Sequence, residues 1–141
     1  MKNTLKPDES RRRTAKTKLQ IELSMKLIAL GNCLSPMTAA FLTDEKLRAS
    51  YYSALATRIN AVLDCLQRKQ KATVGSEKEM WVTAHLQLTK CVESITDILK
   101  PGAVWEIHEL AKKLKKLHKQ IDRSLKFIYD ILNTRQAAEG D

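Results

Sequence analysis

The chain has 141 residues, and its 25 Lys or Arg against 16 Asp or Glu give a formal net charge of +9. This length fits one domain with a single core and is short for two. The charge favours acidic partners, namely nucleic acid, an anionic membrane surface or an acidic protein. No apolar run approaches the ~18 residues that a membrane-spanning helix needs, and the first residues lack the apolar segment of a secretory signal. We therefore expect a cytoplasmic protein without a membrane anchor.

The composition predicts an all-α protein. With 4 Gly, 3 Pro and no run that alternates apolar and polar residues, the sequence lacks the breakers and strand patterns of a sheet protein. Apolar positions recur at helical spacing in four long segments joined by short connections. This arrangement is typical of an antiparallel bundle, most simply up-down-up-down. We predict a flexible leader over residues 1–10, one bundle domain over 11–135 and a frayed tail over 136–141.

The first predicted helix follows the leader and ends at Gly31-Asn32. Its inner stripe consists of Leu19, Leu23, Leu27 and Leu30, and a short helical turn follows Ser35-Pro36. Apolar residues that lie off the inner stripes of the first two helices indicate self-association or a protein partner. These residues are Ile21, Met25, Ile28, Tyr52 and Leu63.

The second and third predicted helices have recognisable starts. Thr43-Asp44-Glu45 opens the second helix, which runs to about Gln70. Ser76 and Glu79 have the spacing of a capping box at the start of the third helix. That helix ends at Lys100-Pro101-Gly102, because a proline disfavours helix at the residue before it.

The last predicted helix, over residues 104–133, is the most strongly amphipathic segment of the chain. It is about 45 Å long at 1.5 Å per residue. Its apolar residues recur at steps of three and four, which places them on one face. They are Ile107, Leu110, Leu114, Leu117, Ile121, Leu125, Ile128 and Leu132.

The opposite face of this helix is strongly basic. Between residues 112 and 126 there are seven Lys or Arg and one acid, Asp122, a local balance of +6. The seven are Lys112, Lys113, Lys115, Lys116, Lys119, Arg123 and Lys126. One interpretation is a solvated face, partly neutralised by Glu109–Lys113 and Asp122–Lys126 ion pairs. The other is a row of phosphate contacts, which need positive charge on a rigid frame and no sequence-reading geometry.

Further basic residues gather at one pole if the helices alternate in direction. The start of the first helix, the turn between the second and third helices and the end of the last helix then lie together. This pole would hold Arg11, Arg12, Arg13, Lys69 and Lys71, which we add to the predicted nucleic-acid-binding residues.

Trp105 admits two interpretations. It lies in register with Lys112 and Lys119, so its indole could stack on an unpaired base. Alternatively, it folds over the Pro101 turn and covers the end of the core.

The sequence lacks the common catalytic and metal-binding patterns. No Glu-x-x-His pair, no His pair at i, i+4 and no Cys/His cluster with zinc spacing occurs, and no glycine-rich phosphate loop is present. Cys33, Cys65 and Cys91 are widely spaced and fit buried, reduced thiols. We therefore expect no catalytic site, no metal, no cofactor and no small-molecule substrate.

These patterns favour a non-enzymatic accessory subunit of a nucleic-acid-processing complex that binds RNA or DNA backbone independently of sequence. The alternative is a protein–protein adaptor or regulator whose basic face binds an acidic partner.

Overall fold

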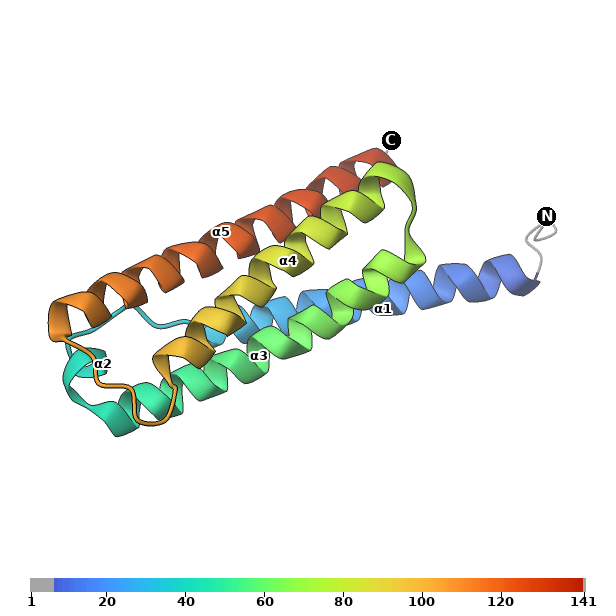
Figure 1. The fold of residues 1–141 in the computed structure, drawn as a ribbon. Coiled ribbons are helices and arrows are strands. Elements are labelled where there is room, and N and C mark those ends of the chain that lie inside the picture. The colour runs from blue at the N-terminus through green and yellow to red at the C-terminus, as the bar shows by residue number, and fades with distance from the viewer. Residues whose placement is uncertain (1–6, 141) are drawn as a thin grey trace.

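The chain forms four long antiparallel helices, which confirms the predicted all-α bundle (Figure 1). The computed structural model describes residues 7–140, and the side chains of residues 14–134. The helices are α1 (Pro7–Cys33), α2 (Ala40–Thr43), α3 (Glu45–Ala72), α4 (Gly75–Ile98) and α5 (Ile107–Gly140). Helix α3 packs against both α1 and α4, and α5 packs against α4. The short α2 contacts α3 and α5, and it lies at the end of the bundle where these two helices begin.

The core is built from the apolar stripes that the spacing predicts. On α5, seven of the predicted positions are buried, and they are Leu110, Leu114, Leu117, Ile121, Leu125, Ile128 and Leu132. The eighth, Ile107, is 53% exposed, so its assignment to the core is wrong. Helix α5 begins at Ile107, three residues later than predicted, after a loop in which Gly102 takes a left-handed φ of +81°. Ile107 therefore lies at the rim of the bundle.

Several helix ends differ from the predicted ones. Helix α1 begins at Pro7 within the predicted leader, since a proline in the first turn needs no amide partner, and α5 continues to Gly140. Helix α3 opens at the predicted segment, and Asp44 is its N-cap, because the Asp44 carboxylate accepts a 3.0 Å hydrogen bond from the Leu47 amide. The predicted capping box is wrong. Helix α4 begins at Gly75, so Ser76 lies inside the first turn and the N-cap residue is Val74, which makes no side-chain hydrogen bond.

Tyr52 is buried, which corrects its inclusion among the residues available for self-association or a protein partner. Its hydroxyl is 2.8 Å from His118 Nε2 on α5, so it links two helices across the bundle. Its ring also packs edge-on against Tyr51, with ring centroids 4.8 Å apart. Leu63 is half-buried against the core. Of the five apolar residues predicted to mediate self-association, Ile21, Met25 and Ile28 remain exposed.

The partial burial of His118 predicts a specific pH dependence of stability. Burial lowers the pKa of His118, and Asp122 opposes this shift. The unfolded chain, with a histidine pKa of about 6.5, then binds more protons than the folded chain below that pH. The free energy of unfolding should therefore fall as the pH drops from about 7 through the ordinary histidine pKa. Urea unfolding of wild type and His118→Gln, measured above about pH 5 to avoid the carboxylates, checks this expectation.

The variant His118→Gln should lose much of this pH dependence because its side chain does not titrate. His108, an exposed histidine near the start of α5, supplies the control. His108→Gln should retain the slope of the wild type. Equal slopes for wild type and His118→Gln would show that His118 does not carry the effect.

Candidate nucleic-acid interface

Helix α5 presents a row of cations to solvent. The basic face of α5 is defined here by Lys112, Lys115, Lys116, Lys119, Arg123 and Lys126, all of which are exposed. They point outward because Leu114, Leu117 and Ile121 occupy the opposite side of the same turns and are buried. The 14-residue interval from Lys112 to Lys126 is about 21 Å long at 1.5 Å per residue. The face is therefore an extended positive surface on one rigid element.

The acids near this face do not neutralise it. Among the side chains of residues 14–134, α5 makes one ion pair, in which Lys113 Nζ lies 3.5 Å from Asp97 Oδ2 of α4. The Glu109–Lys113 and Asp122–Lys126 pairs, which the interpretation as a solvated face invoked, are not formed among these residues. Lys113 turns toward α4, whereas no cation of the basic face of α5 forms an ion pair within that range. This result removes one reason for interpreting the row as an ordinary mixed-charge surface.

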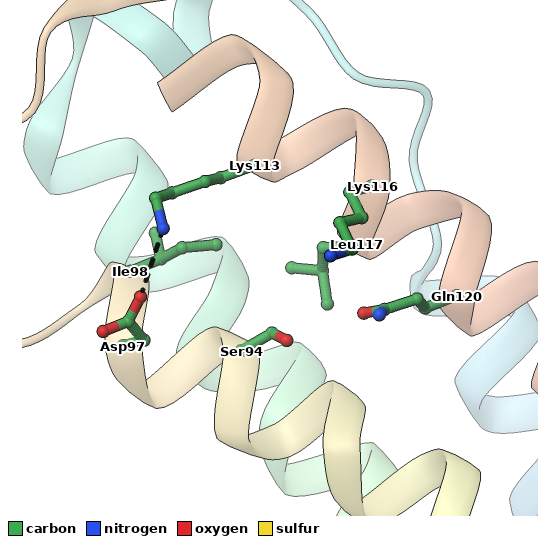
Figure 2. A pocket seen from close by; sticks show the side chains of 7 residues that line it. All are labelled: Ser94, Asp97, Ile98, Lys113, Lys116, Leu117 and Gln120. Atoms are coloured by element: carbon green, nitrogen blue, oxygen red, sulfur yellow. Dashed lines mark ion pairs between the residues drawn. The ribbon is translucent and has the colours of Figure 1, made fainter. Parts of the chain in front are cut away.

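The basic face is hollowed at its centre. Lys112, Lys115, Lys116, Lys119, Gln120 and Arg123 line a shallow depression of about 380 Å³. Lys116 and Gln120 also line a smaller pocket of about 120 Å³ between α4 and α5, with Ser94, Asp97, Ile98, Lys113 and Leu117. Figure 2 shows the polar ends of Ser94 and Gln120 directed into this pocket.

The smaller pocket does not suit an organic substrate. Its volume lies well below the roughly 300–1,000 Å³ typical of small-molecule sites. Its polar lining consists of the Ser94 hydroxyl, the Gln120 amide, the Lys113–Asp97 ion pair and Lys116. Gln120 Oε1 is buried without a hydrogen-bond partner among the described residues. Turning this amide over would present an N–H donor there, which suits water or a small anion.

Trp105 covers the end of the core, which is one of the two predicted alternatives. Its Nε1 donates a 3.1 Å hydrogen bond to the carbonyl oxygen of Ile98. Lys113 Nζ lies 4.8 Å from the centroid of its ring, so one face of the indole is already occupied by a cation. The half-buried Trp105 is therefore a structural residue of the α4–α5 junction and a poor platform for an unpaired base.

Lys69 is buried, which corrects its assignment as a phosphate contact. Its side chain is 2% exposed, and its Nζ donates a 2.8 Å hydrogen bond to Gln20 Oε1. The same Nζ lies 5.5 Å from the ring centroid of Trp81. Lys71, two residues later, is exposed.

The start of α1, the α3–α4 turn and the end of α5 lie at the same end of the bundle, as the alternating helix directions predicted (Figure 1). Arg11, Arg12 and Arg13 belong to α1, and their side chains lie outside the described residues.

A cluster of possible metal ligands is organised by an arginine. One ligand atom each from Glu22, Asp64 and Cys65 lies within 4.8 Å of the others. The Arg68 guanidinium donates to Glu22 at 2.9 Å, approaches Asp64 at 3.2 Å and lies 3.4 Å from Cys65 Sγ. The hydrogen bond from Arg68 lowers the pKa of Glu22, whereas burial raises the pKa of the Cys65 thiol. This chemistry is that of an ion-pair network around a neutral thiol.

Comparison with protein-family models, with curated proteins and with solved structures finds no match to this chain. Within the described residues, no helix combines the length and apolar character needed to cross a bilayer.

Proposed function

We propose that the chain is a non-enzymatic accessory subunit that binds the backbone of RNA or DNA through the basic face of α5. The observation that carries this proposal is the row of six exposed cations, over about 21 Å of helix, that has no acidic partner among the described side chains. Release of counterions from the nucleic acid supplies the affinity of such a contact.

The chemistry of the row favours phosphates over bases. Five of the six residues are lysines, which act as mobile point charges on long stems. Reading a base edge uses planar, bidentate groups such as the guanidinium of arginine or the amides of Asn and Gln. The proposed contact therefore positions nucleic acid without selecting its sequence.

The same face fits an acidic protein less well. Protein interfaces gain most of their affinity from a few buried apolar or aromatic anchors surrounded by a polar rim. The apolar residues between Lys112 and Lys126 are turned into the core, so the exposed part of this face offers no such anchor. A polyanion of uniform charge is the better complement.

The test reverses three charges in the row, with Lys112→Glu, Lys116→Glu and Lys119→Glu in one variant. Affinity for single- and double-stranded RNA and DNA is measured by fluorescence anisotropy at two salt concentrations. Each lost phosphate contact should flatten the log–log salt dependence by about 0.7–0.9. At about 0.1 M salt, three lost contacts correspond to roughly 100-fold weaker binding or more, similarly for unrelated sequences.

A second triple variant separates the site from net charge. Lys16, Lys46 and Lys90 are exposed lysines of α1, α3 and α4, so replacing all three by Glu changes the net charge equally. This control should retain most of the affinity and most of the salt slope. Equal losses of affinity in both variants would show that overall charge, and not the basic face of α5, determines binding. Unchanged, salt-insensitive binding in the α5 variant would contradict the proposal and favour an acidic protein partner.

A further inference from the structure

Gln120 lies between the cations of the basic face of α5 and the small pocket between α4 and α5. It lines both the shallow depression of that face and this pocket, which we call the α4–α5 pocket. Lys116 precedes Gln120 by four residues and Arg123 follows it by three, so both are its neighbours on the helix surface. A strand whose phosphates contact these two cations therefore passes beside Gln120.

The amide of Gln120 has an unmet hydrogen-bonding requirement. Its Oε1 is buried and accepts no hydrogen bond from the residues that the structure describes. Figure 2 shows this amide directed into the α4–α5 pocket, as is the hydroxyl of Ser94. A buried polar atom without a partner is energetically costly. The pocket therefore favours a ligand group that supplies the missing hydrogen bond.

The polar groups of the pocket favour a hydroxyl over a phosphate. Gln120 Oε1 needs a donor, whereas the ammonium group of Lys116 needs an acceptor, and a hydroxyl is both. If the amide is turned over, the hydroxyl accepts from its N–H instead. An ionised phosphate only accepts, so it fits one orientation of the amide, and in the pocket it would also meet the carboxylate of Asp97. A base is too large for a volume of about 120 Å³.

Within a strand, the backbone of RNA carries such a hydroxyl and the backbone of DNA does not. The 2′-hydroxyl of ribose donates and accepts, and it is the group by which proteins distinguish RNA from DNA. We infer that the α4–α5 pocket receives a 2′-hydroxyl of the bound strand through Gln120, so that the chain prefers RNA to DNA. Lys116 is exposed, and its long stem can move to admit the sugar. This inference rests on the proposed function, because the basic face of α5 must first hold the phosphates.

The test measures the affinity of the full chain for three single strands of one sequence, composed of adenine and cytosine so that the bases are identical. The strands are RNA, DNA, and RNA in which fluorine replaces each 2′-hydroxyl, which keeps an RNA-like sugar but removes the donor. Wild type should bind RNA about 3–10-fold more tightly than either other strand, the gain expected from one hydrogen bond. Gln120→Leu removes the amide without changing the charge, so its affinity for RNA should fall to that for DNA. Its affinity for DNA and its salt slope should stay those of wild type.

Gln87 supplies a matched control. Its Oε1 is also buried without a partner among the described residues, but Gln87 belongs to α4 and lines neither the depression nor the α4–α5 pocket. Gln87→Leu should keep the RNA preference, and far-ultraviolet circular dichroism should show both variants folded.

Two results overturn the inference while leaving the proposed function intact. Equal, salt-dependent binding of all three strands by wild type assigns the pocket to water, and this comparison requires no variant to fold. An RNA preference that survives Gln120→Leu places the recognition of the hydroxyl elsewhere. The proposed function fails by a different result, namely binding that does not respond to salt or to the triple variant of α5.

Discussion

Leu117→Asp is expected to abolish cooperative unfolding of the bundle. Leu117 is 1% exposed in the middle of the buried stripe of α5, so an aspartate there places a carboxylate among apolar side chains. An unpaired charge in a core costs several kcal/mol, a large part of the roughly 5–15 kcal/mol that stabilises a typical domain. Thermal unfolding followed by far-ultraviolet circular dichroism should show a broad, low-temperature transition or none.

The preceding residue provides a control with the same substitution. Lys116 is exposed, so Lys116→Asp keeps its carboxylate in water and should leave a cooperative transition near that of wild type. The contrast between two adjacent positions tests which side of α5 faces the core. A cooperative, wild-type-like transition in Leu117→Asp would contradict the bundle.

Trp81→Ala is expected to have the largest effect among truncations that introduce no charge. Trp81 is fully buried on α4, and removing its indole leaves a cavity beside Lys69. Truncation of a buried tryptophan typically lowers the free energy of unfolding by about 3–5 kcal/mol. Urea unfolding followed by circular dichroism measures this loss.

Trp105→Ala is the matched comparison. Trp105 is half-buried at the α4–α5 junction, so its truncation should cost less, about 1–2 kcal/mol. The affinity of the Trp105→Ala variant for single-stranded nucleic acid should remain close to that of wild type. A selective loss of about 1–3 kcal/mol for single strands would show that a base stacks on Trp105 after all. Equal destabilisation by the two truncations would contradict their assigned places in the core.

Helical spacing predicted the parts of the structure that a single helix determines. The buried leucines of α5 and the cations opposite them follow from one periodic pattern, and both were assigned correctly to the inner and outer sides. Helical spacing does not predict which residues of different helices contact one another. Tyr52, for example, contacts His118, which is 66 residues away in the sequence.

The candidate interface shows the same difference between patterns within one helix, which the sequence predicts, and contacts between helices, which it does not. Lys69 was predicted to contact phosphate because it lies near the turn between the second and third helices, yet Gln20 and Trp81 enclose its side chain from two other helices. Local spacing allowed Lys113 to pair with Glu109 one turn earlier, but Lys113 pairs with Asp97 of α4 instead. Local spacing shows which charges share a helix side, but the packing of the helices decides which charges are paired.

The order in which the helices contact one another also bears on how the chain folds. The three extensive interfaces join α1 to α3, α3 to α4 and α4 to α5, so each long helix packs on the next one along the sequence. Folds with mainly local contacts form quickly, in microseconds to milliseconds for helical bundles. The α3–α4 hairpin is closed by Thr73 and Val74 alone. Closing this short loop costs less conformational entropy than closing the longer connections of the bundle. During synthesis, α1 can bury its inner leucines once α3 has emerged, before the lysines of α5 have been made.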